Sequence, residues 1–445
     1  MTVVHSPAGA WRGTRREKVS VFRGIRYAEA ARFGPPRRLP PHTGVADAVR
    51  PGDIAPQSPS RLEGVMGAAA PLPQSEDCLR LTVTTPDPRP SAARPVLVWM
   101  HGGAYLTGSG EWNLYDAERL SAEGDIVVVS VAYRLGALGY LCVPGLSDGN
   151  LGLLDQIAAL GWVHDSIAAF GGDPGRVTVA GQSAGAHSAA AMLGIDDASR
   201  LFGRAVLQSA PLGLGFASPG DAERVGALFL RHLGADPLRA PVADILAAQA
   251  RTARELAGPL GLGSAPPFLP VAGSRPLPAP AAWRASVVRR AKAGLDVMLG
   301  TTDDEMTAFY GRHPVFTALR RVPLAGDAIA DRIQRAVQDR VFERPTRRLA
   351  DLLAGSGANV YRYQVRRFHP GGPFGACHCI ELPLLFGDGD AWRDAPMLAG
   401  IAPETLASAG ARTRALWSAF ARSGVPDGSR WRRHTPRSRH ARALP

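Results

Sequence analysis

Lysine is almost missing from this chain, and its positive charge is spread thinly. Lys18 and Lys292 are the only lysines, so arginines supply nearly all of a formal net charge of +12 over 445 residues. The arginines are scattered, which argues against a nucleic-acid or anionic membrane partner. Only residues 430–445 hold a dense arginine run, and we interpret this segment as a flexible basic tail.

Cysteine is scarce as well. The four cysteines, at positions 78, 142, 377 and 379, are too few for a disulfide framework in a chain of this size, which favours a reduced, cytoplasmic protein. Cys377, His378 and Cys379 resemble a cluster of metal ligands, but no second Cys/His pair follows at a zinc-site spacing. We therefore expect no metal site.

Long apolar runs are also absent. No stretch of 18 or more apolar residues occurs, so no membrane span is expected. Residues 1–16 have no apolar run after a basic start, so no signal peptide is indicated. With 45% apolar and 20% charged residues, the composition is instead typical of a globular enzyme with a large core.

Short apolar runs alternate with helical patterns along the chain. The runs at 95–100, 126–132 and 177–180 predict buried strands, and apolar spacing over 151–170 predicts a helix. Strands that alternate with helices indicate a mostly parallel central sheet with helices on both faces, the α/β class. Further strands are expected at 295–299 and, at the sheet edge, at 358–365, and a last helix is expected over 405–423.

A looser segment interrupts this alternation. Residues 211–294 are rich in Gly, Pro and Ala, with amphipathic pieces at 222–232 and 242–256. An excursion of this length between two strands predicts a helical cap over the substrate. We expect a single domain over 1–445 that contains this cap.

The sharpest local motif is Gly181-Gln-Ser183-Ala-Gly185, a G-x-S-x-G sequence between a predicted strand and a predicted helix. The glycines allow a tight turn that exposes the serine oxygen at the sheet edge. The motif therefore predicts Ser183 as a nucleophile. The alternative is a serine that caps an ordinary helix.

A serine hydroxyl needs a base and an acid, in the chain order serine, acid, histidine for this arrangement. Acid candidates are the triplet Asp303, Asp304 and Glu305, directly after the strand at 295–299. The alternative is a solvated acidic loop. The histidine candidates cannot be ranked from the pattern alone, and they are His313, His369, His378, His434 and His440.

Acyl transfer also needs N–H groups aimed at the oxyanion. The small-residue loop His101–Ala104 follows a buried strand, and its backbone can approach a ligand closely. The N–H of Ala184 lies beside the nucleophile. An ordinary glycine turn is the alternative interpretation of the loop.

Longer motifs extend these signals along nearly the whole chain. They are FRGIRYAEAARF (22–33), SEDCLRLTV (75–83), HGGAYLTGSG (101–110), VAYRLGALGYL (131–141) and the segment 149–185 that ends in GQSAG. Together they resemble the type-B carboxylesterase and cholinesterase family, bacterial para-nitrobenzyl esterases above all. The resemblance implies an α/β-hydrolase fold and hydrolysis of small-molecule carboxylic esters by a serine esterase.

The resemblance also assigns roles to particular residues. It implies Ser183 as nucleophile, Glu305 from GTTDDE as the acid and His378 from CHCIELPLLFG as the base, acting through an acyl-enzyme. The oxyanion donors that it implies are the N–H groups of Gly103, Ala104 and Ala184. Serine, base and oxyanion donors suffice for this chemistry, so we expect no metal and no organic cofactor, and we expect a monomer or a weak homo-oligomer.

Two structural ion pairs are implied by the same resemblance. They join Arg32 with Glu76 and Arg134 with Asp173. We interpret these charges as parts of the scaffold, not of the catalytic machinery.

The chain departs from the family pattern at several positions. Gln182 replaces a glutamate that many members have before the serine, Cys78 lacks the upstream partner that it has in secreted relatives, and Ala68 replaces a cation-binding tryptophan. We therefore expect a free, buried thiol at Cys78 and no choline-ester specialist. The sequence after Trp431 also lacks an apolar run for a closing strand.

Two rival functions remain open at this point. The same site could cleave amides or carbamates, or transfer the acyl group to an alcohol, because pocket walls decide the leaving group. A non-catalytic adhesion or scaffold protein would need a broken triad, whereas all three triad positions are present.

Overall fold

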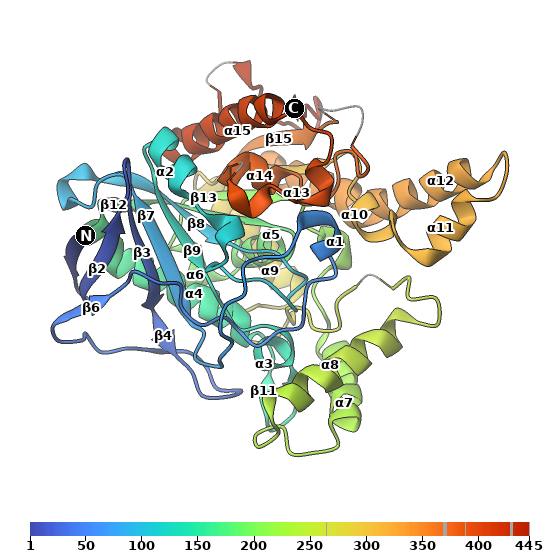
Figure 1. Ribbon diagram of the computed structural model, residues 1–445, viewed down its shortest axis with the longest axis horizontal. Coiled ribbons are helices and arrows are strands. Elements are labelled where there is room, and N and C mark those ends of the chain that lie inside the picture. The colour runs from blue at the N-terminus through green and yellow to red at the C-terminus, as the bar shows by residue number, and fades with distance from the viewer. Residues whose placement is uncertain (264, 368–371, 388, 428–429, 445) are drawn as a thin grey trace.

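A central β-sheet crosses the whole molecule in the computed structural model (Figure 1), which describes residues 1–263, 265–367, 372–387, 389–427 and 430–444. Its strands are β1 (Thr2–Ser6), β2 (Gly9–Arg15), β3 (Ser20–Arg26), β6 (Val45–Asp47), β7 (Arg80–Thr85), β8 (Arg94–Met100), β9 (Val127–Val131), β12 (Gly172–Gln182), β13 (Arg204–Gln208), β14 (Asp296–Thr302), β15 (Asn359–Val365) and β16 (Arg442–Leu444). Short two-stranded pairs lie outside it, formed by β4 (Ala28–Glu29) with β5 (Arg37–Arg38) and by β10 (Cys142–Val143) with β11 (Ser147–Asp148).

The sheet is antiparallel at its N-terminal end and parallel over the rest. In the described part of the chain its order is β1-β2-β3-β7-β9-β8-β12-β13-β14-β15-β16, with β6 beside β2. The pairs β1–β2, β2–β3, β3–β7 and β7–β9 are antiparallel, whereas β6 pairs in parallel with β2 and the strands from β9 through β16 run parallel. The carboxyl ends of the parallel strands therefore meet at one edge, where such folds place their ligands.

Apolar side chains on both faces of the parallel strands explain why these strands are internal. In β8, Val96 and Val98 pack in one core cluster, whereas Leu97 and Trp99 pack in another. This alternation puts a separate core on each face of the sheet. The predicted α/β class, with a mostly parallel sheet and helices on both faces, is confirmed.

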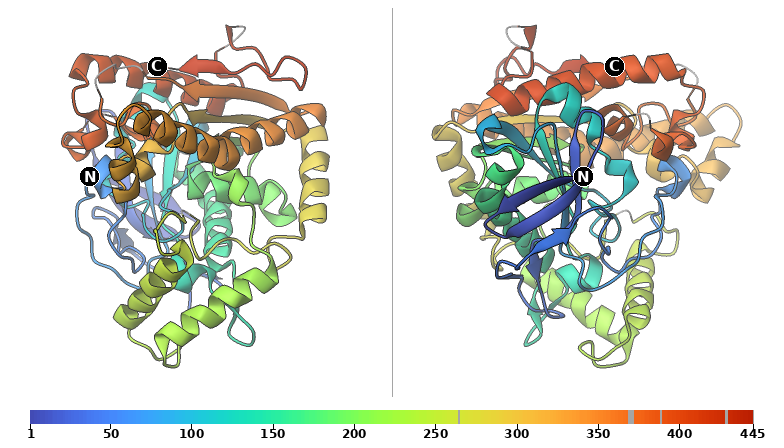
Figure 2. Two further views of the ribbon diagram at one scale, coloured as in Figure 1. Left: turned by 90° about the vertical axis from the view of Figure 1, so that its right-hand side faces the viewer. Right: turned by 60° about the vertical axis from the view of Figure 1, so that its left-hand side comes forward.

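Helices cover both of these cores (Figures 1 and 2). They are α1 (Glu63–Met66), α2 (Glu118–Gly124), α3 (Gly136–Tyr140), α4 (Leu151–Ser166), α5 (Ala184–Met192), α6 (Asp196–Ser199), α7 (Pro219–Leu233), α8 (Val242–Ala257), α9 (Pro280–Lys292), α10 (Thr307–Tyr310), α11 (Pro314–Arg320), α12 (Gly326–Gln338), α13 (Arg344–Gly355), α14 (Glu381–Phe386) and α15 (Pro403–Ser423). Core residues of α4, α9 and α13 share one cluster, and those of α14 and α15 share the other.

The excursion predicted over 211–294 divides into two parts. Helices α7 and α8 pack against each other and form a lobe beside the sheet (Figure 1). Helix α9 instead packs on α13, and its Val287 and Ala291 belong to the sheet core. The first two helices thus project from the sheet, whereas α9 is a crossover helix between β13 and β14.

A second lobe, formed by α11 and α12, was not predicted from the sequence (Figure 1). A π-helical turn at Asp339–Glu343 connects α12 to α13. Helix α12 has helical spacing of its apolar residues, but it buries Gln334 and Gln338 while Ile329 and Ile333 are exposed. This reverses the usual distribution of polar and apolar side chains.

The expectation that the chain lacks a closing strand after Trp431 is wrong. β16 pairs in parallel with β15, so β15 has neighbours on both sides, and Trp431 and Leu444 are buried. Three residues with one buried apolar side chain are too few to give a strand pattern, because backbone hydrogen bonds carry most of the pairing. Residues 442–444 of the predicted tail are therefore part of the sheet.

The predicted pairing of Arg134 with Asp173 is also wrong. Arg134 forms a bidentate ion pair with Asp155 of α4. Its Nε and Nη2 atoms lie 2.8 Å and 2.7 Å from the two carboxylate oxygens, and both side chains are buried. Arg134 follows the carboxyl end of β9, whereas Asp173 lies at the amino end of β12, which runs in the same direction. The two residues therefore lie at opposite edges of the sheet. The other implied pair, Arg32 with Glu76, is confirmed.

Candidate active site

A strained turn holds Ser183 between β12 and α5. The backbone of Ser183 has φ 56° and ψ −122°, a conformation that L-residues rarely adopt. Space explains the glycines on either side: a Cβ at Gly181 would lie 2.5 Å from the carbonyl carbon of Gly185, and a Cβ at Gly185 would lie 2.0 Å from the Met100 oxygen. The turn thus has the geometry expected of a nucleophile elbow.

Glu305 and His378 form a buried hydrogen-bonded pair. Oε2 of Glu305 lies 2.6 Å from Nδ1 of His378, and neither side chain is more than 1% exposed. The other carboxylate oxygen of Glu305 accepts the N–H of Thr302 at 2.9 Å, which fixes the carboxylate at the end of β14. An acid placed in this way orients the imidazole with Nε2 facing away from the carboxylate.

The fold gives the three adjacent acids 303–305 different surroundings. Asp304 accepts hydrogen bonds from Arg367 Nε at 2.7 Å and from the Ala376 N–H at 2.9 Å, so it orders the loop that leads to His378. The Asp303 carboxyl has a raised pKa because of burial and the neighbouring charge of Asp304. Glu305 alone of the three hydrogen-bonds to His378.

The remaining histidine candidates lie elsewhere or outside the described residues. His313 caps α11 by accepting the Val315 N–H, and His434 binds Asp351 at 2.8 Å. The carbonyl of His440 lies 3.4 Å from the His434 ring. His369 is among the residues that the structure does not describe.

Gln182 occupies the other side of the imidazole. Its Nε2 lies 3.0 Å from Nε2 of His378. In the described part of the chain no hydrogen bond joins the Ser183 hydroxyl to His378, although both residues line the same pocket. Bonds of this kind are often long before substrate binds and tighten in the complex.

The candidate oxyanion loop lies beside the serine. Gly103 has φ +116°, and a Cβ there would lie 2.0 Å from the Thr107 oxygen, so the turn requires glycine. Ala104 follows with φ 56°, and both residues line the pocket together with Ala184. Among the hydrogen bonds of the described residues, none uses the N–H of Gly103, Ala104 or Ala184. These N–H groups are available to a ligand oxygen.

A buried carboxyl next to this pair was missed by the sequence analysis. Glu381 accepts hydrogen bonds from Tyr363 at 2.9 Å and Ser209 at 3.4 Å. Burial, and then the charge of Glu305, raise the pKa of Glu381 to about 8. The signal available in the sequence was the position of Glu381 three residues after His378, because this spacing can place two side chains on one helical turn.

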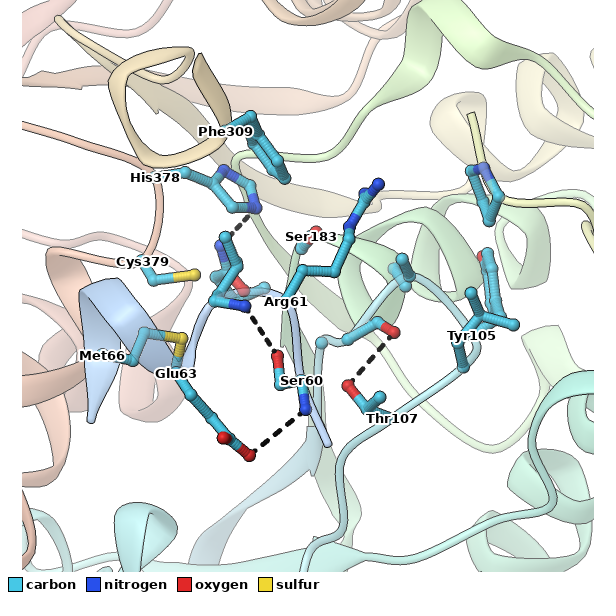
Figure 3. A pocket seen from close by; sticks show the side chains of 18 of the residues that line it. Ser60, Arg61, Glu63, Met66, Tyr105, Thr107, Ser183, Phe309, His378 and Cys379 are labelled. Carbon is cyan, nitrogen blue, oxygen red and sulfur yellow. Dashed lines mark hydrogen bonds between the residues drawn. The ribbon is translucent and has the colours of Figure 1, made fainter. Parts of the chain in front are cut away.

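The pocket lining is mostly apolar, with Arg61 and Glu63 among its charged residues (Figure 3). Pro211, Leu214, Phe309 and Phe342 belong to its apolar part. The Phe309 and Phe342 rings lie 5.2 Å and 5.4 Å from the His378 ring. The imidazole therefore lies close to two aromatic side chains.

The neighbouring cysteines do not supply a reactive thiol. Cys377 and Cys379 are buried and free, and burial raises the pKa of both thiols. Cys78 is a free, buried thiol, as predicted.

Within the described ranges, no group of three or more His, Cys, Asp or Glu side chains could hold a metal ion. No helix in that part of the chain is both long and apolar enough to span a membrane.

The sheet, its elbow at the carboxyl edge and the acid–histidine pair define the α/β-hydrolase fold. The model of the carboxylesterase family matches residues 1–318. The solved structure of a thermophilic PNB esterase is 31% identical, has a TM-score of 0.84 and covers 99% of this chain and 95% of its own. The chain therefore belongs to the carboxylesterase family and is a carboxylic ester hydrolase.

Two further relatives are similar over nearly the full length. A protein of Rhodococcus erythropolis named probable N-octanoylanthranilate hydrolase is 58% identical over 99% of this chain and 97% of its own length. Phenmedipham hydrolase of Pseudarthrobacter oxydans is 34% identical over 95% of this chain and 90% of its own.

Proposed function

We propose that Ser183, His378 and Glu305 form a catalytic triad that hydrolyses acyl substrates through an acyl-enzyme. The observation that carries this proposal is the buried 2.6 Å bond between Glu305 and Nδ1 of His378. It leaves Nε2 to take the proton of Ser183 as the serine oxygen attacks the acyl carbonyl. The protonated His378 then gives this proton to the leaving group, and water releases the acid by the reverse sequence.

The N–H groups of Gly103, Ala104 and Ala184 are proposed to bind the oxyanion that forms at each step. Two of them come from the loop after β8 and one from the start of α5, so they approach the oxygen from two sides. No reorganisation is needed when charge develops, because backbone N–H groups in a strained loop are already oriented.

The proposed leaving group is an aromatic amine as well as an alcohol. The support is the 58% identity with the probable N-octanoylanthranilate hydrolase, whose named substrate is an N-acyl aromatic amide. The apolar lining of the pocket, which includes Pro211, Leu214, Val341 and Phe342, is suited to a medium-length acyl chain. Hydrolysis of N-acyl aromatic amides is therefore proposed as a second reaction of the same triad.

The test compares 4-nitrophenyl octanoate with N-octanoylanthranilate in wild type, Ser183→Ala and His378→Gln. Both variants should lose at least about 10³-fold in kcat on both substrates, because the triad acts as a unit. Amide turnover should disappear together with ester turnover. A wild-type kcat in either variant would contradict the proposed triad. Ester cleavage without amide cleavage by the wild type would contradict the proposed second reaction.

A further inference from the structure

The pocket holds one strongly basic side chain among mostly apolar neighbours. Among the described residues that line it, arginine or lysine occurs once, at Arg61. Arg61 belongs to the loop before α1 and lines the same pocket as Ser183 (Figure 3). A guanidinium presents several N–H donors in a planar fork, which matches a carboxylate.

Phe309 connects Arg61 to the base. The Arg61 guanidinium carbon lies 5.7 Å from the centroid of the Phe309 ring, and the same ring lies 5.2 Å from the His378 imidazole. A group that leaves with the His378 proton must lie next to this imidazole. Arg61 therefore packs on a ring that borders the place where the leaving group takes its proton.

The Arg61 side chain is accessible to a ligand in the pocket. Arg61 is exposed, while nearby protein atoms lower the pKa of its guanidinium by partial desolvation. A carboxylate bound there forms charge-assisted hydrogen bonds, which are shorter and stronger than neutral ones.

We propose that Arg61 binds a carboxylate carried by the leaving group of the substrate, next to the scissile bond. This inference rests on the proposed function, in which an aromatic leaving group receives its proton from His378. A carboxylate on the ring carbon beside the scissile nitrogen or oxygen reaches past His378 toward Arg61. The ring itself packs against Phe309. Arg61 thereby selects ortho-carboxylated aryl amides and esters over neutral ones.

The kinetic test uses two esters that share one acyl chain, 2-(octanoyloxy)benzoate and phenyl octanoate. In Arg61→Gln, kcat/KM should fall at least about tenfold more on the carboxylated ester than on phenyl octanoate, through KM, since a hydrogen-bonded charge pair is lost. Arg61→Lys should recover part of the difference. Arg312→Gln is the matched control, because Arg312 stacks on Phe374 and does not line the pocket.

Equal losses on the two esters would mean that Arg61 is merely structural and would overturn the inference. No loss on either ester would overturn it as well. Binding of 2-aminobenzoate, measured by calorimetry on Ser183→Ala with and without Arg61→Gln, separates this result from a failure of the triad. Weaker binding without Arg61 supports the inference even if Ser183 proves not to be the nucleophile, and unchanged binding contradicts it.

Discussion

The side-chain amide nitrogen of Gln182 lies 3.0 Å from Nε2 of His378, opposite the nitrogen that Glu305 binds. With the amide assigned in this way, its N–H donates to the Nε2 lone pair, so the imidazole carries its proton on Nδ1. This is the tautomer that a general base requires. Gln182 also competes with the Ser183 hydroxyl for the same lone pair, and substrate binding must shift that balance.

Replacing Gln182 by glutamate should change the pH dependence of hydrolysis. A carboxylate at this distance favours the imidazolium over the neutral ring, so the acidic limb of kcat/KM should move to higher pH by about 1 unit. The pH–rate profile of Gln182→Glu on 4-nitrophenyl octanoate measures this shift. Gln182→Met, which is neutral and of similar length, should leave the limb in place. The same displacement in both variants would show that charge is not its cause.

The buried Glu381 should make stability depend on pH. Because its pKa is raised from 4.5 to about 8, the folded protein keeps a proton that the unfolded chain releases in this range. The contribution of Glu381 to the free energy of unfolding is thus complete below about pH 4.5 and is lost as pH rises through about 8. Urea unfolding from pH 5 to 8.5 should show a steeper decline in wild type than in Glu381→Gln.

The control for this measurement is Glu404→Gln, since Glu404 lies on the exposed start of α15. It should follow the wild-type decline. Parallel curves for wild type and Glu381→Gln would contradict a protonated Glu381.

The ion pair between Arg134 and Asp155 should be a major contributor to stability. Asp155→Asn leaves the Arg134 charge buried without its counter-ion, which should lower the free energy of unfolding by about 3–5 kcal/mol. Asp173→Asn removes a charge but keeps a side-chain oxygen that can accept the Gly175 N–H, so it should cost at most about 1 kcal/mol. Chemical unfolding of the two variants checks the order. A larger loss of unfolding free energy in Asp173→Asn would instead support the ion pair between Arg134 and Asp173 that was expected from the sequence.

Much of the parallel sheet could be predicted because its strands are short apolar runs and its turns need glycine. The elbow at Ser183 and the loop at Gly103 follow from this local chemistry. Glu305 and His378 could not be chosen from the pattern alone. Three adjacent acids share one loop. Asp304 is excluded as the partner of His378 only by its tertiary contacts with Arg367 and Ala376.

Features that depend on tertiary packing were missed. Arg61 is one of many scattered arginines, and nothing in the sequence brings it near Phe309. Glu381 is charged in isolation and becomes a neutral acid only through burial beside Glu305. The partner of Arg134 depends on strand direction, which places Asp173 at the far edge of the sheet.

The most direct test of the nucleophile is labelling by a fluorophosphonate, located by peptide mass spectrometry. We expect one adduct, on Ser183, that disappears in Ser183→Ala together with ester hydrolysis. Ser199→Ala, altered within the same tryptic peptide between Arg176 and Arg200, should label as wild type does. An adduct on another serine, or labelling that persists in folded Ser183→Ala, would contradict the assignment of Ser183 as the nucleophile.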